Sequence, residues 1–235
     1  MRLDKYLCES TELTRSQARK AIKRGEVSCD DQLVLKADFK VLKSMQVSLE
    51  GRPLQPRGTR YIMLNKPLDT LCSNVDEEGY GSVLSLVDLD KARALKIAGR
   101  LDVDTTGLVL LTDDGHWAHQ VTSPNKESGK RYRVRLANHL PKNDYESIVA
   151  LFAEGVQLRN ETGLTKPAQL EIIAPDEVLL TLFEGRYHQV KRMFAALGNK
   201  VVGLHREQVG AIELDCALAP GQWRYLSECE IAGFQ

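Results

Sequence analysis

The chain has 235 residues, 43% of them apolar, and equal numbers of acidic and basic side chains, so its formal net charge is zero. This length supports one large or two smaller buried cores, and the apolar fraction argues against disorder. No apolar run approaches the roughly 20 residues that cross a bilayer, and the charged start lacks the apolar stretch of a signal peptide. Five scattered cysteines without a Cys-x-x-Cys pair indicate reduced thiols, so we expect a cytoplasmic protein without a disulfide framework or zinc site.

The charge is unevenly distributed along the chain. Residues 1–60 carry 13 Lys and Arg and 8 Asp and Glu, a surplus of five positive charges. The rest of the chain carries 19 Lys and Arg and 24 Asp and Glu, which balances that surplus. A basic segment on a mildly acidic body suits a nucleic-acid partner for that segment. An ordinary solvated surface is the alternative.

The first 50 residues predict short helices and strands. An amphipathic turn at 3–7 precedes a helix at 16–24, whose apolar positions recur three and four residues apart. Gly25 suits the end of that helix because glycine readily adopts a positive φ. Residues 26–28 and 46–49 predict two strands.

Two prolines and two glycines between positions 51 and 58 interrupt these patterns. They predict a linker at about 51–60. The linker would separate a first domain at 1–58 from a second domain at 61–235.

From Tyr61 onward the pattern changes to longer apolar segments. We expect strands at 61–64, 108–111, 130–136, 168–173, 178–183, 200–204 and 211–214, and helices at 143–154 and 187–197. Strands in runs, with few helices between them, favour an α+β fold over a regular alternation of strand and helix.

The densest polar cluster, GRLDVDTTG at 99–107, comes directly before a predicted buried strand. One interpretation is a calcium loop, in which five residues take EF-hand positions: Asp102, Asp104, Thr106, Gly107 and Asp113. The last of these is Asp where a bidentate Glu is preferred, and no partner loop exists.

A second interpretation of the same cluster is a turn whose side chains form hydrogen bonds to their own backbone. A third interpretation is a catalytic Asp102 at the edge of a cleft, kept ionised by basic groups such as Arg100.

A second polar cluster occupies residues 184–193. On the predicted helix, Tyr187 lies one turn from Lys191, and His188 lies one turn from Arg192. Cations near a helix start oppose the helix dipole, so they favour a nearby anion over a role in stability. A solvated basic face is the alternative.

The predicted strand at 130–136 alternates arginines with Tyr132 and apolar residues. RNA suits this arrangement, because guanidinium groups bind phosphates and an aromatic ring stacks on an unstacked base. The alternative is that Tyr132 packs in the core beside Val134 and Leu136. Metal-ligand spacings, glycine-rich phosphate loops and hydrolase signatures are absent from the sequence, so we expect neither a metal nor a cofactor.

Together these motifs resemble one family. The segments YIMLNKP (61–67), GRLDVDTTGLVLLTDDG (99–115), Lys-x-Tyr (130–132) and EGRYHQVKRMFAALGNKVVGLHR (184–206) are similar to signatures of the RsuA-type ribosomal RNA pseudouridine synthases.

The N-terminal segment resembles the S4 RNA-binding domain. RLDKYL (2–7) and the Gly-x-Val at 25–27 follow its pattern, and Thr14-Arg15-Ser16 stands where that pattern usually begins with Ser-Arg. The resemblance implies a small S4-like α/β RNA-binding domain at 1–58. It also implies a larger catalytic domain at 61–235, built on a mixed, mainly antiparallel sheet with flanking helices.

The resemblance also implies roles for individual side chains. Asp102 would be the nucleophile, Tyr132 the ring that stacks on the target base, and Lys191 the basic partner of Asp102. Many relatives carry Arg at the position of Lys191, so a bidentate pair would become a single ammonium contact here. We expect RNA to contact a further set of side chains: Arg2, Lys5, Arg15, Arg19, Lys20, Lys23, Arg24, Arg100, Arg186, His188 and Arg192.

The segment HQVKRMF at 188–194 resembles the small-subunit branch of the family. It implies that uridine 516 of 16S RNA is converted to pseudouridine, within a small-subunit assembly intermediate. No cofactor or membrane would take part, because the isomerisation involves no redox change, and we expect a monomer. Two alternatives stay open: a family member acting on 23S RNA, and a non-catalytic S4-type RNA-binding or ribosome-assembly protein.

Overall fold

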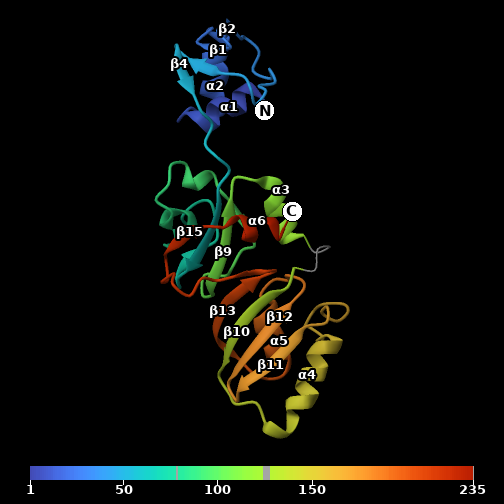
Figure 1. Cartoon of the computed structure of the whole chain (residues 1–235). Helices are drawn as coiled ribbons and strands as arrows, with labels where there is room; N and C mark the ends of the chain where they lie inside the picture. Colours follow the sequence, from blue (N-terminus) through green and yellow to red (C-terminus); the bar gives the residue numbers. More distant parts are fainter. Residues whose placement is uncertain (78, 124–127, 235) are drawn as a thin grey trace. The chain divides into compact units, whose positions relative to one another are not determined.

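The computed structural model describes residues 1–77, 79–123 and 128–234 (Figure 1). The chain divides into two compact units, Met1–Thr59 and Arg60–Gln235. Among the described residues, no helix is long and apolar enough to cross a membrane.

The first unit packs two helices on a small antiparallel sheet with strand order β2-β1-β3-β4. Its elements are α1 (Leu3–Ser10), α2 (Arg15–Lys23), β1 (Val27–Cys29), β2 (Gln32–Leu33), β3 (Val47–Leu49) and β4 (Arg52–Leu54). Helix α2 begins one residue before the predicted start because Thr14 and Gln17 form a capping box. The apolar faces of both helices meet β1 and β3 in a core of their own.

Part of the predicted linker at 51–60 is a strand. β4 pairs with β3, with Pro53 opposite Ser48. A proline has no N–H to donate, and it is tolerated here because β4 is the edge strand of the sheet. The prolines and glycines therefore mark an edge strand as well as a connection, which corrects the start of the linker.

The second unit is built on a nine-stranded sheet of order β11-β12-β10-β13-β9-β5-β15, with β14 beside β13 and β8 beside β9. The strands are β5 (Tyr61–Lys66), β8 (Lys96–Ala98), β9 (Thr106–Thr112), β10 (Lys130–Leu136), β11 (Gln169–Ala174), β12 (Glu177–Leu182), β13 (Val201–Val209), β14 (Ile212–Glu213) and β15 (Trp223–Tyr225). Among the described strand pairs of this sheet, only β13–β9 is parallel. The prediction of a mixed, mainly antiparallel sheet in an α+β fold is confirmed.

Helices and short connections cover this sheet. They are η1 (Val83–Leu86), η2 (Ala92–Ala94), α3 (Gly115–Thr122), η3 (Lys142–Asp144), α4 (Tyr145–Glu154), α5 (Gln189–Ala196) and α6 (Glu228–Ala232). A separate parallel pair, β6 (Thr70–Leu71) with β7 (Gly81–Ser82), leads into η1.

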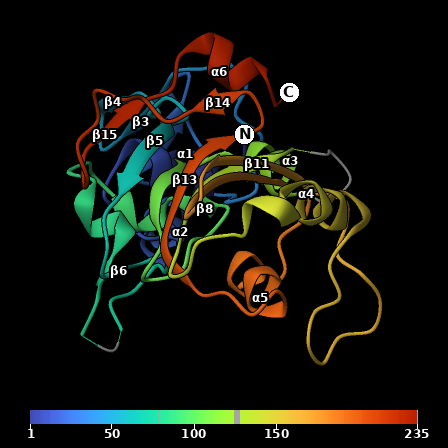
Figure 2. The same cartoon turned by 90° about the horizontal axis from the view of Figure 1, so that it is seen from below.

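Strand β9 separates two hydrophobic cores. Val109 and Leu111 belong to the core that includes α4 and α5, whereas Leu108 and Leu110 belong to the core that includes α3 and adjoins α6. Successive side chains of a strand point to opposite faces, so burial of both faces explains the continuous apolar run. Seen from below, α5 and α6 lie on opposite sides of β13 (Figure 2).

Candidate active site

Asp102 lies in the loop between β8 and β9, at the wall of a cleft of about 550 Å³. Its side chain is 34% exposed, so the carboxylate is accessible from the cleft. Side chains from four segments line the same space: Arg100, Asp102, Lys130, Tyr132, His188, Lys191 and Arg206. A volume of this size suits one small ligand or one unstacked nucleotide.

A buried arginine holds the start of the Asp102 loop. Arg206, on β13 and 1% exposed, donates to the carbonyl oxygens of Gly99 at 2.7 Å, Leu108 at 2.8 Å and Arg100 at 3.4 Å. A charge this deep needs polar partners, and the loop carbonyls supply them. The loop is thereby tied to the sheet before it reaches Asp102.

A buried lysine holds the end of the same loop. Lys66, at the end of β5 and fully buried, donates from Nζ to the carbonyl oxygens of Thr105 at 2.8 Å, Pro67 at 2.9 Å and Val103 at 3.2 Å. Burial lowers the pKa of Lys66. Asp102 therefore sits between two braced stretches of backbone.

Close packing of β9 on β13 requires a glycine after the loop. Gly107 pairs with Arg206 in the parallel ladder and has a φ of +103°. A Cβ on Gly107 would lie 2.3 Å from the carbonyl oxygen of Arg206, which is closer than any real contact. The glycine thus lets Arg206 lie beside the loop that it braces.

Two basic side chains face the Asp102 carboxylate. Lys191 Nζ and His188 Nε2 each lie 3.5 Å from Asp102 Oδ2. Lys191 is closer to Asp104, at 2.6 Å from Oδ1. Burial raises the pKa of Asp104, but the hydrogen bond and charge of Lys191 outweigh it and the pKa lies below its ordinary value. Lys191, expected to serve Asp102, is therefore shared between two carboxylates.

The helix that carries Lys191 begins later than the sequence pattern predicts. Helix α5 starts at Gln189, and His188 before it adopts a left-handed conformation with φ 48°. Tyr187 therefore precedes the helix, and its expected one-turn pairing with Lys191 is wrong, whereas the carbonyl oxygen of His188 at the N-cap accepts from the backbone N–H of Arg192 at 3.0 Å. The Oε1 atom of Gln189 accepts a hydrogen bond from the backbone N–H of Arg186 at 2.9 Å, which fixes this late start.

Tyr132 belongs both to the core and to the cleft. The residue is 9% exposed and packs in the same core as Val134 and Leu136. This packing agrees with the alternative prediction that Tyr132 is a core residue. Tyr132 also lines the cleft beside Asp102, where an aromatic face can meet a base. Lys130, two residues earlier, lines the same space, and burial lowers its pKa.

The arginine face of β10 is occupied by ion pairs. Arg131 contacts Glu207 and Glu213, and Arg133 contacts Glu207 and Glu177. These guanidinium groups already have carboxylate partners within the sheet, which weakens the expectation that this face of the strand binds phosphates.

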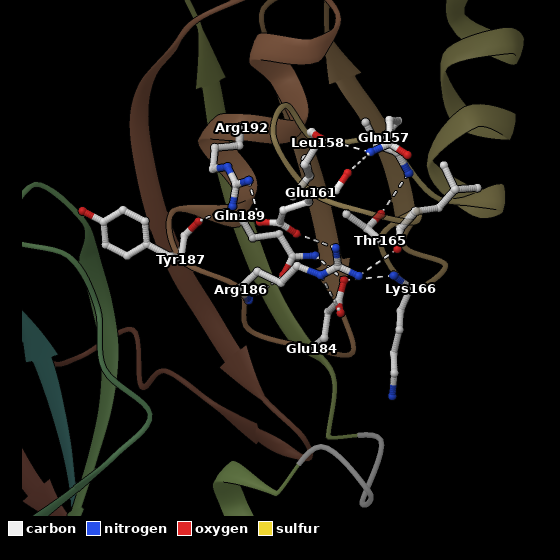
Figure 3. Close-up of polar contacts among 12 residues, drawn as sticks. Gln157, Leu158, Glu161, Thr165, Lys166, Glu184, Arg186, Tyr187, Gln189 and Arg192 are labelled. Atoms are coloured by element: carbon white, nitrogen blue, oxygen red, sulfur yellow. Dashed lines mark hydrogen bonds and ion pairs between the residues drawn. The ribbon is translucent and has the colours of Figure 1, made fainter.

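Two cations expected to bind RNA also form ion pairs. Arg186 Nη1 lies 2.7 Å from Glu161 Oε2 and its Nε lies 3.1 Å from Glu184, while Arg192 Nη2 lies 2.5 Å from Glu161 Oε1. Figure 3 shows these groups converging on Glu161. Both arginines are therefore held by carboxylates, in contrast to the free cations that the sequence suggests. Arg100, by comparison, is exposed on the cleft wall.

The basic residues of the first unit gather around one buried carboxylate. Arg2, Arg15 and Arg19 approach Asp4, whose side chain is fully buried, at 3.1, 3.4 and 3.3 Å. Lys20 and Lys23 share a shallow pocket with Arg15 and Arg19. The remaining two form local ion pairs: Lys5 with Glu9 at 3.3 Å, and Arg24 with Glu26 at 3.6 Å.

The calcium interpretation of the Asp102 cluster is wrong. Thr106 begins β9, and Asp113 at the far end of that strand pairs with Arg60 at 2.7 Å, so the five residues do not converge. In the part of the chain that the structure describes, no three His, Cys, Asp or Glu residues gather to hold a metal.

Sequence comparison matches residues 60–196 to the RNA pseudouridylate synthase family and residues 1–47 to the S4 domain. The chain belongs to the RNA pseudouridylate synthase family. Asp102, Tyr132 and Lys191 fall within the segment matched to the family, whereas Arg206, which braces the Asp102 loop, lies beyond its end.

Curated relatives of the same family cover the whole chain. The chain is 51% identical over 233 residues to the ribosomal small subunit pseudouridine synthase A of Vibrio cholerae, with 99% of this chain and 98% of that protein covered. It is 50% identical to the protein of the same name from Escherichia coli, with 99% of each covered. A crystal structure of a pseudouridylate synthase matches the fold over all of both chains, with a TM-score of 0.71 and 46% identity.

Proposed function

We propose that this protein isomerises a uridine of small-subunit ribosomal RNA to pseudouridine, with Asp102 as the nucleophile. The observation that carries the proposal is the position of the Asp102 carboxylate: it is accessible from a nucleotide-sized cleft, lies between Lys191 and His188, and its loop is braced on both sides. The names of the relatives support the small ribosomal subunit as the source of the substrate. Within it, we propose uridine 516 of 16S RNA.

The chemistry needs one ionised carboxylate and room for a base to turn. In the proposed reaction the N1–C1′ bond of the uridine breaks with the help of Asp102, uracil rotates, and C5 joins C1′. A proton leaves C5 and one is gained at N1, so atoms and electrons balance without a cofactor. Lys191 Nζ and His188 Nε2, each 3.5 Å from Asp102 Oδ2, hold the carboxylate in place.

The target base must leave its stack before it can reach Asp102. Unstacking costs on the order of a few kcal/mol, least where the RNA is already single-stranded. Tyr132 supplies an aromatic face inside the cleft that offsets part of this cost. The basic first unit contributes phosphate contacts that keep the RNA bound while the base is turned.

We further propose that the protein acts as a monomer, in the cytoplasm, on a small-subunit assembly intermediate. Sedimentation of the protein alone and with assembly intermediates would test the oligomeric state and the substrate. A sedimentation coefficient of a dimer would contradict the first.

Mapping of pseudouridines in ribosomal RNA tests the proposed target. Cells that lack this protein should lose one pseudouridine of 16S RNA, at position 516, and a plasmid copy should restore it. The Asp102→Asn variant should not restore it. Loss of a 23S modification would favour the large-subunit alternative, and an unchanged map of both RNAs would favour a non-catalytic role.

A further inference from the structure

Tyr187 is the most exposed large apolar or aromatic side chain recorded for the described residues, with 77% of its surface accessible. One face of its ring stacks on His188, with ring centroids 3.8 Å apart and planes 21° from parallel. Most of the ring is therefore left in solvent, although an aromatic ring gains free energy when its face is covered.

His188 connects this exposed ring to the catalytic carboxylate. Its Nε2 atom lies 3.5 Å from Asp102 Oδ2, and its ring carries Tyr187 on one face. The left-handed backbone of His188, with φ 48°, is strained for a residue with a Cβ. Strain of this kind persists only where the surroundings hold it, and here they keep His188 in the lining of the Asp102 cleft with the Tyr187 ring stacked on it.

A network of ion pairs holds the backbone beneath Tyr187. Arg192 Nη1 donates to the carbonyl oxygen of Tyr187 at 3.1 Å, and Glu161 pairs with both Arg192 and Arg186. Arg186 also donates to the carbonyl oxygen of Leu164 at 2.7 Å. In Figure 3 the ring of Tyr187 points away from this polar cluster. A rigid backbone therefore presents a free aromatic face.

Single-stranded RNA is the ligand whose chemistry fits this face. When a target uridine leaves its stack, the neighbouring base loses a partner on the side of the gap. A rigid aromatic ring next to the cleft can take that place, and stacking of this kind accepts any base. We infer that Tyr187, supported by His188, is a stacking platform for the nucleotide next to the target uridine. This inference rests on the proposed function, since it assigns a second nucleotide to the same site.

Replacement of Tyr187 by Ala tests the platform. The Kd and KM for a short single-stranded RNA that contains the target uridine should rise about 5- to 150-fold, the loss expected for one stacked base. The kcat at saturating RNA should change little, because the residue binds a neighbour of the reacting nucleotide. Tyr187→Phe should behave like the unmodified protein. Tyr225→Ala, which removes another exposed tyrosine that does not stack on a residue of the cleft lining, is the matched control.

A fluorescent base gives a direct readout. With 2-aminopurine placed on either side of the target uridine, one of the two positions should be quenched on binding to the unmodified protein and to Tyr187→Phe, but not to Tyr187→Ala. Unchanged Kd and unchanged quenching with Tyr187→Ala would overturn the platform. Binding and quenching require no turnover, so they test the platform independently. If the pseudouridines of ribosomal RNA are unchanged in cells that lack this protein, the proposed function fails instead.

Glu161 should act as a positioning residue for the same platform. Glu161→Gln removes the charge that holds Arg186 and Arg192, so KM should rise in the unmodified background with kcat nearly unchanged. In the Tyr187→Ala background the same substitution should have no further effect on KM. Additive effects of the two substitutions would show that Glu161 acts elsewhere.

Discussion

At the scale of single residues, two carboxylates of one loop take different environments. Asp102 is 34% exposed at the cleft wall and lies between Lys191 and His188, whereas Asp104 is 61% exposed and has the shortest contact with Lys191. Only Asp102 lines the cleft. The loop therefore presents one carboxylate to a substrate and uses the other to hold the cation between them.

Asp102→Asn should fold normally, bind RNA and form no detectable pseudouridine. The substitution keeps the shape of the side chain and removes the charge and the nucleophilic oxygen, so turnover should fall by at least about 10³-fold. Asp104→Asn makes the same chemical change in the same loop, and its turnover should fall by no more than about tenfold. Quantification of pseudouridine after a single turnover measures both, and substantial activity of Asp102→Asn would remove it as the nucleophile.

Lys191→Met should reduce turnover on the order of 10²-fold, the usual effect of losing one charged group beside a reacting carboxylate. Lys191→Arg should retain most activity, because a guanidinium reaches both carboxylates.

The pKa of Asp104 is lowered by Lys191 and should rise toward its ordinary value in Lys191→Met. An NMR titration of the Asp104 carboxyl carbon would detect this rise. Since the folded-state pKa of Asp104 is lowered, its contribution to stability is present above the ordinary Asp range and is lost on acidification. An unchanged titration would show that Lys191 acts without this contact.

At the scale of secondary-structure elements, the Asp102 loop depends on how β9 meets β13. Lys66 and Arg206 reach the loop from strands on either side of β9, and Gly107 allows the close parallel approach. The geometry of the Asp102 loop is thus a property of three adjacent strands.

Gly107→Ala should destabilise the second unit by about 3 kcal/mol, because a Cβ would collide with the Arg206 carbonyl and the φ is unfavourable for alanine. Gly81→Ala, at a position with open space around the added carbon, should cost less than about 0.5 kcal/mol. Urea unfolding followed by tryptophan fluorescence compares them. Equal stability of the two variants would show that β9 and β13 can separate without penalty.

The arginines on the first unit's helices are organised by Asp4. Hydrogen bonding from Arg2 holds the pKa of Asp4 well below its usual range, with Arg19 and Arg15 adding to the effect and burial opposing it. Stability from this carboxylate is therefore present above the ordinary Asp range and is lost only as the pH falls toward the lowered pKa.

Asp4→Asn should weaken RNA binding, although it removes a negative charge and so raises the net charge of the protein by one. Attraction between net charges alone predicts tighter binding, but three guanidinium groups would lose the negative charge and one of the two acceptor oxygens that fix their positions. Asp31→Asn makes the same charge change at an exposed position of the same unit and should bind RNA as tightly as the unmodified protein or more so. Tighter binding by both variants would show that Asp4 does not organise the arginines for RNA.

At the scale of the whole molecule, the chain consists of two compact units with separate cores. The first unit carries a surplus of positive charge, and the second carries the cleft. Binding and catalysis can therefore be separated by deletion.

Removal of residues 1–59 should leave a folded second unit that binds RNA more weakly. The plot of log affinity against log salt concentration should become less steep, because fewer phosphates are neutralised. Filter binding at several salt concentrations measures the slope, and circular dichroism confirms the fold. If affinity and slope both stayed the same, the basic residues of the first unit would be a solvated surface.

Much of the fold and part of the site follow from local sequence pattern. The capping box of α2, the alternation along β10 and the apolar run of β9 each reflect contacts within a few residues, so periodicity finds them. The sequence pattern does not predict the three-residue strands β8 and β15, because three residues carry too little pattern and pairing with β9 or β5 holds them.

The sequence by itself determined the α+β class, the family and the loop that carries Asp102, because these depend on periodic burial and on contiguous motifs. Only the tertiary structure decided how the charged side chains are used. It buries Lys66 and Arg206 as braces of that loop, divides Lys191 between Asp102 and Asp104, and engages Arg186 and Arg192 with Glu161. The physical reason is distance along the chain: partners such as Lys191 and Asp102 are 89 positions apart, and packing alone determines which opposite charges meet.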